Sequence, residues 1–367
     1  MIWQEELRRN VETAEELAKY LPMTEEEIRE MDAIIEKWPM SVPRYYLSLI
    51  DFNDPNDPIA KLSLPNMREI ETDDGLFDQS GEGKNTKLIG LQHKYGPTAL
   101  LLSTNLCGMY CRHCFRKRLV GLTESETAQY FDEVYEYVES HKELTNVLVS
   151  GGDSFLNSNK RIEEILSHFS KLSHLDFIRF GTRTPVVFPQ RINDDEELLD
   201  ILEKYGKEKK IYVVTQYNHP NELTEQSLQS IENLRRRGII VSNQTVLLKG
   251  INDDPEILSQ LMRGLIAGGV LPYYVFQCRP VAGVKKQFQV PIKDAYDIVS
   301  RSRHSLDGHS KRFRYIMSHE TGKIEILGKL SENEMLFKYH HAKDPKNEER
   351  IFTYKLTDDC SWLPEHI

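Results

Sequence analysis

Three cysteines lie within eight positions in the stretch Cys107-Gly-Met-Tyr-Cys111-Arg-His-Cys114, shortly after the apolar run ALLLST at residues 99–104. Thiolates are the ligands that iron–sulfur clusters prefer, and a tight loop with this C-x3-C-x2-C spacing can bring three of them to three corners of a cubane. The fourth iron is then open to a small molecule, whereas a cluster with four cysteine ligands normally only carries electrons. The stretch therefore predicts a [4Fe–4S] cluster that takes part in chemistry.

Two other interpretations of these cysteines are a zinc site with His113 as the fourth ligand and a group of unrelated thiols. Adjacent His113 and Cys114 are poorly placed to bind one ion together, and zinc sites usually come as paired C-x2-C units. The remaining two of the five cysteines are Cys278 and Cys360. An odd number, with three crowded together, suits a metal site better than a disulfide framework.

Outward from the cysteines, short apolar or β-branched runs alternate with amphipathic, helix-like stretches. The runs are ALLLST at 99–104, NVLVS at 146–150, FIRFG at 177–181, IYVVTQ at 211–216, GIIVSNQ at 238–244 and PYYVFQ at 272–277. Such alternation predicts parallel βαβ units with right-handed crossovers. We therefore expect an α/β fold, a partial TIM-like (β/α) barrel, whose reactive groups sit at the C-terminal ends of its strands.

We expect three regions along the chain. Residues 1–88 form a helical N-terminal extension and linker, in which Thr24-Glu25-Glu26-Glu27 has the form of a capping box and 51–88, rich in Asp, Asn, Pro and Gly, indicates a long ordered loop. Residues 89–300 form the partial barrel. Residues 301–367 form a more β-rich C-terminal segment, which includes YIMSHETGKIEIL.

The composition is that of a globular protein with a sizeable core, since 39% of the 367 residues are hydrophobic and 28% are charged. A net charge of -10 argues against binding to nucleic acid or to acidic membrane surfaces, and favours a small-molecule substrate. The first residues lack the form of a secretory signal, and no apolar stretch approaches the roughly 20 residues of a membrane helix. We expect a cytoplasmic protein.

The cysteine motif after the first strand of a parallel barrel resembles the radical S-adenosylmethionine superfamily, and longer segments resemble the lysine 2,3-aminomutase family within it. These segments are RYYLSLIDFNDPNDPI, LQHKYGPTALLLSTNLCGMYCRHCFRKR, VSGGDSF, GTRTPVVFPQRI, YNHPNE and SNQTVLLKGIND, in order over about residues 44–253. The resemblance implies that Cys107, Cys111 and Cys114 hold a [4Fe–4S] cluster, which binds S-adenosylmethionine and cleaves it to a 5′-deoxyadenosyl radical. It implies that pyridoxal 5′-phosphate carries a migrating amino group. The partners it implies are a flavodoxin- or ferredoxin-type reductant and further copies of the chain in a homo-oligomer.

The segment Ser150-Gly151-Gly152-Asp153 follows the NVLVS run. Read alone it is as typical of a turn as of a site, because paired glycines let a backbone approach a ligand and a carboxylate can accept from an ammonium or hydroxyl. The resemblance implies that Gly151, Gly152 and Asp153 bind the amine of S-adenosylmethionine. It places four further residues on or near the same pocket: Arg183, Asn218, His219 and Gln244. An isolated histidine at a strand end, such as His219, is more often structural.

Arg116 stands in the run Arg116-Lys117-Arg118, two residues beyond the last cysteine. A charge run is usually a solvated face. Here the cysteine loop keeps the run close to the cluster, and the resemblance makes Arg116 the partner of the substrate α-carboxylate, a task that suits a guanidinium fork.

Pyridoxal phosphate requires a Schiff-base lysine, which the aminomutases carry after a run of glycines that this chain lacks. Matching LDGH at 306–309 places Lys323 in that region, with Lys311 as a lesser alternative and loss of the cofactor as a third. The T-G-K sequence is also typical of a hairpin turn with a solvated lysine. His93, Lys94 and Tyr95 match the family segment near the cofactor ring and phosphate, and favour its retention.

Arg279 follows Cys278 at the end of the PYYVFQ run. The lysine enzymes have an aspartate here that pairs with the substrate's terminal ammonium, and a second aspartate at the position of Ser318. An arginine facing a buried ammonium leaves both ions unpaired, at a cost of roughly 2 to 5 kcal/mol. A side-chain carboxylate would instead pair bidentately with Arg279, so glutamate is the expected substrate unless Arg279 turns outward on its loop.

The lysine enzymes also use cysteines for a structural zinc, and one such position is Asp254 here, while the tail TDDCSWLPEHI holds only Cys360. We expect no zinc. The leading hypothesis is an isomerase, a glutamate 2,3-aminomutase. The alternatives are a lysine 2,3-aminomutase, a radical enzyme without pyridoxal phosphate that acts on another substrate, and an iron–sulfur electron carrier.

Overall fold

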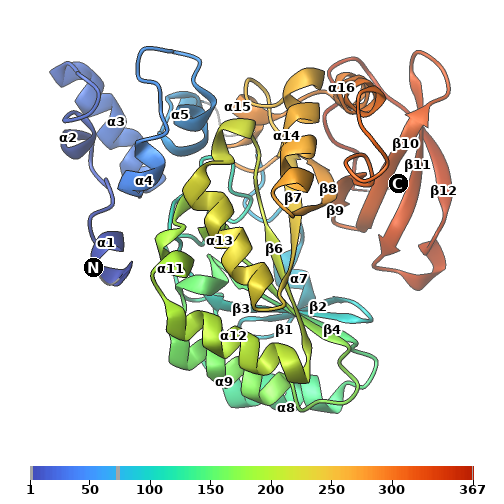
Figure 1. The fold of residues 1–367 in the computed structure, drawn as a ribbon. Helices are drawn as coiled ribbons and strands as arrows, with labels where there is room; N and C mark the ends of the chain where they lie inside the picture. The colour runs from blue at the N-terminus through green and yellow to red at the C-terminus, as the bar shows by residue number, and fades with distance from the viewer. Residues whose placement is uncertain (1–2, 72–74, 366) are drawn as a thin grey trace.

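One continuous sheet organises the molecule (Figure 1). The computed structural model describes residues 3–71, 75–365 and 367, and twelve strands in it pair in the order of the chain, from β1 to β12. Within the described residues the pairing runs from edge to edge without closing into a ring. The expected partial barrel is therefore confirmed as an open one.

The centre of this sheet is parallel. From β3 through β9, neighbouring strands pair in parallel. These strands are β3 (Thr98–Thr104), β4 (Asn146–Gly151), β5 (Phe177–Gly181), β6 (Lys210–Thr215), β7 (Ile240–Leu247), β8 (Leu271–Gln277) and β9 (Arg314–His319). The first six fall on the six predicted runs, because βα alternation is a strong local pattern.

Helices connect the parallel strands and carry the capping residues that start them. The longer helices are α8 (Phe131–Ser140), α9 (Asn159–Phe169), α12 (Glu196–Glu208), α13 (Glu225–Arg236), α14 (Pro255–Ala267) and α16 (Ile292–His304). The shorter ones are η1 (Ser154–Leu156), α10 (Thr184–Val187), α11 (Gln190–Asn193), η2 (Pro220–Glu222) and α15 (Lys285–Phe288). Side chains of Ser158, Thr224 and Asp254 accept hydrogen bonds from the first turns of α9, α13 and α14.

The N-terminal extension is helical, as expected. It contains α1 (Trp3–Leu7), α2 (Ala14–Leu17), α3 (Glu25–Lys37), α4 (Arg44–Leu47), α5 (Pro58–Ser63), α6 (Arg68–Glu71) and α7 (Glu82–Asn85). Thr24 and Glu27 form the predicted capping box at the start of α3. The described residues of 51–88, a stretch predicted as loop, instead contain three short helices. Of these, α5 starts at Asp57 as N-cap with Pro58 in its first turn.

Antiparallel strands flank the parallel set on both sides. β1 (Thr86–Leu88) and β2 (Leu91–Tyr95) precede it, and β10 (Gly322–Lys329), β11 (Glu334–Ala342) and β12 (Ile351–Lys355) follow it, with η3 (Pro345–Asn347) between the last two. The β-rich C-terminal segment is thus confirmed. Because the sheet continues across residues 88 and 300, the three-region division stays a prediction.

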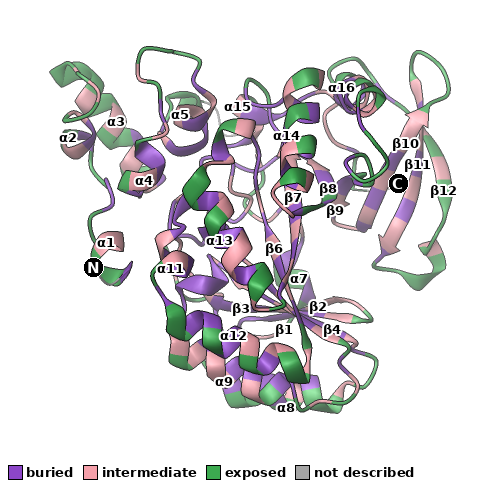
Figure 2. Ribbon diagram, in the orientation of Figure 1, coloured by how far each residue is buried: buried purple, intermediate pink, exposed green. Residues whose placement is uncertain are grey.

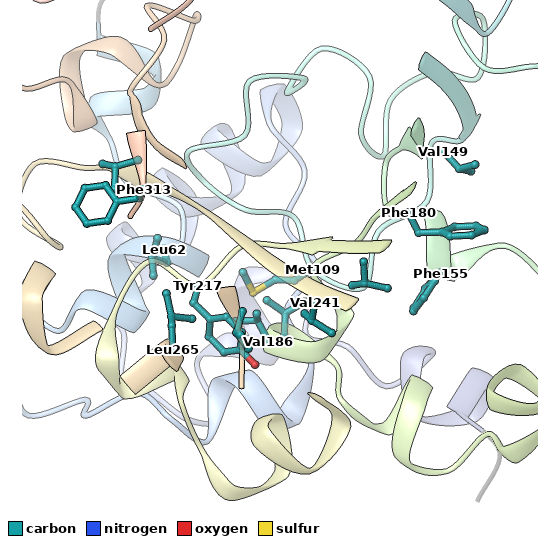
Figure 3. Close-up of a cluster of buried hydrophobic side chains, with 14 of the residues drawn as sticks. Leu62, Met109, Val149, Phe155, Phe180, Val186, Tyr217, Val241, Leu265 and Phe313 are labelled. Atoms are coloured by element: carbon teal, nitrogen blue, oxygen red, sulfur yellow. The ribbon is translucent and has the colours of Figure 1, made fainter. Parts of the chain in front are cut away.

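The core lies between the helices and the outer face of the sheet (Figure 2). Alternate residues of β4, β5 and β6, such as Val149, Phe180 and Val213, are fully buried against the helices. Figure 3 shows Val149, Phe155 and Phe180 beside one another in this layer. Each such side chain contributes about 1.5 to 3 kcal/mol through burial. The other face of each strand is only partly buried, as along β7, and it lines the concave side. In the described part of the chain, no helix is both long and apolar enough to cross a membrane.

Candidate active site

The cysteine loop begins where β3 ends at Thr104 and is fastened to the N-terminal extension. The N–H of Tyr110 donates to the carbonyl of Ser41, and that of Arg112 donates to the carbonyl of Leu62, both at 3.0 Å. The side chain of Arg112 is fully buried in an ion pair with Glu69, which also binds Lys117 at 2.6 Å. The extension therefore fixes the shape of the loop that presents the cysteines.

The three cysteines of the loop are free thiols that act on one another electrostatically. Burial raises the pKa of Cys114 to about 11 and raises that of Cys107 well above its usual value, and neighbouring thiolates add to both shifts. Iron would bind them as thiolates, because the deprotonated sulfur is the form that ligates a metal. No three His, Cys, Asp or Glu side chains among the described residues could hold one single ion.

Arg183 lies beside the cysteines at the end of β5. Its Nη1 donates to Sγ of Cys111 at 2.8 Å, and its Nη2 donates to Glu222 at 2.5 Å. Glu222 is fully buried and accepts a further hydrogen bond of 2.6 Å from Tyr46 in α4. Arg183 therefore stabilises negative charge on the cysteine loop, and Glu222 and Tyr46 are residues of the site that sequence analysis did not find.

The paired glycines bring the end of β4 against the cysteine loop. A Cβ on Gly151 would lie 2.2 Å from the carbonyl oxygen of Thr104, and one on Gly152 would lie 2.3 Å from that of Leu106. The Asp153 carboxylate accepts hydrogen bonds from Thr182 Oγ1 and from backbone N–H groups, as the N-cap of η1. The predicted role of Asp153 in binding the amine of S-adenosylmethionine stays a prediction.

Asn218 and His219 follow β6, and Gln244 lies on the partly buried face of β7. Asn218 is fully buried, where its Oδ1 accepts from the N–H of Val246 at 2.9 Å and its Nδ2 donates to Nε2 of His113 at 3.2 Å. His219 accepts from Asn221 and starts η2, which is a structural task. The Nδ1 of His113 is buried without a partner among the described residues.

Arg116 is held by Glu82 of α7, a residue that sequence analysis missed. Nε and Nη2 of Arg116 donate to Glu82 at 2.9 and 2.8 Å, and Nη1 donates to Ser150 Oγ and to the carbonyl of Gly151. Arg118 also donates to Glu82, at 2.7 Å. Burial opposes the charge of Glu82, but the two arginines outweigh it and lower its pKa to about 2. Of the five N–H groups of Arg116, one on Nη2 is left for a ligand.

Arg279 turns inward from the end of β8. Its Nη1 donates to Oγ of Ser80, its Nη2 donates to Oγ of Ser318 at 2.9 Å, and its Cζ lies 4.0 Å from the ring centroid of Phe115. Burial lowers its pKa to about 10. Among the residues that the structure describes, no carboxylate forms a hydrogen bond or ion pair with Arg279. The guanidinium thus keeps three unpaired N–H groups in a partly buried site.

Lys323 lies in β10, opposite Ser318 of β9, rather than in the turn between them. Its Nζ lies 5.0 Å from the ring centroid of Tyr274 and 5.9 Å from that of Tyr95. Burial, together with the nearby cations, lowers its pKa to about 7. A neutral amine near pH 7 is the form that reacts with an aldehyde. Lys311, by contrast, is exposed on the loop before β9.

Further basic side chains lie on the same side. The Nζ of Lys94 donates to the carbonyl of His319 at 2.8 Å, and burial lowers its pKa to about 7. Arg179 of β5 acts electrostatically on Lys323, and its Nε is buried without a partner in the described chain. His341 lies beside Tyr95, with the ring centroids 5.6 Å apart. An amine of lowered pKa with an excess of cations around it fits pyridoxal phosphate.

Three residues singled out from the sequence lie apart from these contacts. His93 instead packs on α8, where its Nδ1 is 3.0 Å from the hydroxyl of Tyr137. Asp254 is the N-cap of α14. The Sγ of Cys360 is 3.3 Å from the carbonyl oxygen of Trp362.

An open parallel barrel with three cysteines in the loop after β3 defines a radical S-adenosylmethionine protein, and residues 101–261 match the family described as "Radical SAM superfamily". A "Putative L-lysine 2,3-aminomutase" of Aquifex aeolicus is 43% identical, over 93% of this chain and 91% of its own. The "L-lysine 2,3-aminomutase" of Clostridium subterminale is 37% identical, over 84% and 73% of the two chains. The "Glutamate 2,3-aminomutase" of Clostridioides difficile is 34% identical, over 83% and 71%.

The chain belongs to the lysine 2,3-aminomutase family of radical S-adenosylmethionine enzymes. It is an isomerase of the aminomutase type. The superfamily implies a [4Fe–4S] cluster and S-adenosylmethionine, and the lysine 2,3-aminomutases are dependent on pyridoxal phosphate.

Proposed function

We propose that the protein is a pyridoxal phosphate-dependent glutamate 2,3-aminomutase, which moves the α-amino group of L-glutamate to the β carbon. One observation carries this proposal. Arg279 turns into the site with three free N–H groups, and it has no carboxylate partner among the described residues. An unpaired guanidinium in a partly buried pocket favours an anion and disfavours a cation.

The roles of the residues follow from their places. Cys107, Cys111 and Cys114 hold the cluster, and Gly151, Gly152 and Asp153 bind the amine of S-adenosylmethionine. Arg183, Asn218, His219 and Gln244 complete that pocket. When bound, the cluster and S-adenosylmethionine supply a radical that removes a substrate hydrogen, and pyridoxal phosphate carries the amino group.

Lys323 is the residue that binds pyridoxal phosphate covalently. Its lowered pKa supports this role, as does the absence of a carboxylate partner among the described residues. Lys94, Tyr95, Arg179 and His341 surround the phosphate, because they supply hydrogen-bond donors and positive charge on the same side of the sheet.

The substrate lies between the two arginines. Arg116 gives its remaining Nη2 hydrogen to the α-carboxylate, while Glu82 and Ser150 fix the plane of its guanidinium. Arg279 and Ser318 bind the side-chain carboxylate. Because Arg279 has more free donors, we assign it the larger share of the affinity for the substrate.

A lysine 2,3-aminomutase is the second candidate, because relatives of 43% and 37% identity carry that name. The charge around Arg279 argues against it. Incubation of the reduced, reconstituted protein with S-adenosylmethionine and pyridoxal phosphate, in separate reactions with L-glutamate and L-lysine, tests both. Chromatography should show β-glutamate and no β-lysine. We keep a flavodoxin- or ferredoxin-type reductant, a homo-oligomer and a cytoplasmic location as predictions.

A further inference from the structure

Two guanidinium groups, those of Arg116 and Arg279, lie over the ring of Phe115. The Cζ of Arg116 lies 4.6 Å from its centroid and that of Arg279 lies 4.0 Å from it. Phe115 follows Cys114 directly and is partly buried. Both distances are measured to the same ring centroid. The two Cζ atoms are therefore no farther apart than the sum of the two distances.

Two like charges at this distance repel each other unless something holds them. Arg116 has its own carboxylate partner, Glu82. Among the described residues, the hydrogen bonds of the Arg279 side chain go to the hydroxyl groups of Ser80 and Ser318 alone. The negative face of an aromatic ring attracts a cation, most strongly where water is scarce. Phe115 is therefore the group that brings Arg279 close to Arg116 without neutralising it.

We propose that Phe115 is a positioning residue that sets the spacing of the two guanidinium groups, and that this spacing selects short dicarboxylic α-amino acids. The inference rests on the proposed function. The carboxyl carbons of glutamate are joined by four carbon–carbon bonds of about 1.5 Å each, so one molecule can reach both arginines at once.

The chemistry of the shift sets the lower limit of substrate length. Moving the amino group of aspartate from C2 to C3, with one hydrogen moving back to C2, gives aspartate again, because the two carboxylates of its carbon skeleton are equivalent. Glutamate is the shortest dicarboxylic amino acid for which the product is a different compound. The separation of the two guanidinium groups over the Phe115 ring suits the length of the glutamate carbon chain.

The test uses glutarate, a dicarboxylate of the same carbon chain that cannot react, as a calorimetric probe of the cluster-loaded protein. Phe115→Leu removes the ring face with little change in volume, and Phe115→Tyr keeps it. The matched control is Phe352→Leu, since Phe352 lies on β12 and also carries an arginine, with the Cζ of Arg350 5.2 Å from its centroid. We expect Phe115→Leu to weaken glutarate binding at least about tenfold. Phe115→Tyr and Phe352→Leu should stay within about threefold of the parent protein.

The monocarboxylate butyrate should show no such dependence on Phe115. Iron content and visible spectrum should be unchanged in Phe115→Leu, which separates the effect from damage to the cluster loop. Unchanged glutarate binding in Phe115→Leu, or no binding by the parent protein, overturns the inference.

Kinetics with glutamate distinguish failure of the proposed function from failure of the inference about Phe115. If glutarate binds with the expected pattern but glutamate is not isomerised, the proposed function fails and the role of Phe115 stands. If glutamate is isomerised with an unchanged KM in Phe115→Leu, the function stands and the inference fails.

Discussion

Glu82 accepts hydrogen bonds from Nε and Nη2 of Arg116 at 2.9 and 2.8 Å, so a residue of the short helix α7 fixes the guanidinium next to the cysteine loop. Both side chains are more than nine-tenths buried, and Glu82 also pairs with Arg118. A buried carboxylate shared by two arginines is costly to remove, because its loss leaves Arg116 without a carboxylate partner among the described residues and leaves Arg118 with Glu126 alone.

We expect Glu82→Gln to lower the free energy of unfolding by about 3 kcal/mol, the usual cost of breaking a buried pair. Urea unfolding followed by circular dichroism measures it. The matched control is Glu126→Gln, which removes the more exposed partner of Arg118 and should cost less than about 1 kcal/mol. Equal losses in the two variants would contradict the central place of Glu82.

The pKa of Glu82 also determines how its contribution to the free energy of unfolding changes with pH. Its pKa is about 2 in the folded protein, below the usual value of 4.5. Its contribution to stability is therefore complete above about pH 4.5 and is lost as the pH falls toward 2. The stability difference between the parent protein and Glu82→Gln should narrow over that window, as measured by urea unfolding at several pH values. A difference that stays constant down to pH 2 would show that Glu82 does not titrate there.

We expect Cys111→Ala to abolish cleavage of S-adenosylmethionine, because two thiolates cannot hold the cluster with one open iron. Iron analysis and the yield of 5′-deoxyadenosine from the reduced protein measure it. Cys360→Ala is the control, since Cys360 lies outside the cysteine loop, and it should keep its iron and its activity. Production of 5′-deoxyadenosine at the native rate by Cys111→Ala would rule out the assignment.

We expect borohydride reduction in the presence of pyridoxal phosphate to label Lys323, as located by mass spectrometry of peptides. The lysine reacts as the neutral amine, and its pKa is about 7. The rate of labelling should therefore rise with pH through that value and then level off. Lys323→Ala should lose the label and Lys311→Ala should keep it. A label on Lys311 would refute the assignment.

The six central strands could be predicted from the sequence because alternating apolar runs and helical stretches are a local pattern, and Thr24 and Glu27 carried the capping signal of α3. The helices within 51–88 were missed, although Asp57-Pro58 is an N-cap signal, because Asp, Asn and Pro also mark loops. The assignment of Lys323 to pyridoxal phosphate stays a prediction. Its position within β10 depends on pairing with β9 and could not be read from the T-G-K sequence.

Within the site, the residues that were missed act through tertiary contacts. Glu82 is 34 positions from Arg116 in the chain, and no local pattern links the two. The role of Phe115 becomes visible only in the folded structure, where the guanidinium of Arg279 lies over its ring. Arg179 could have been found from the sequence. Residues alternate between the two faces of the strand FIRFG, so Arg179 lies on the face opposite Ile178 and Phe180. A charged residue in a strand of the central sheet indicates a functional role.

Arg279 should decide which side-chain charge the enzyme accepts. Its partly buried guanidinium has three N–H groups without a hydrogen-bond partner among the described residues, so a carboxylate gains charge-assisted hydrogen bonds and an ammonium meets repulsion. We expect Arg279→Gln to reduce kcat/KM for glutamate at least about 30-fold, since truncating one side of such a pair costs about 2 kcal/mol or more. The control is Arg303→Gln, because Arg303 also lies over a phenylalanine ring, that of Phe313, but outside the site; it should keep the native value. Faster turnover of lysine than of glutamate by the parent enzyme would overturn the assignment whatever the variants do, because an unpaired arginine cannot favour a cation.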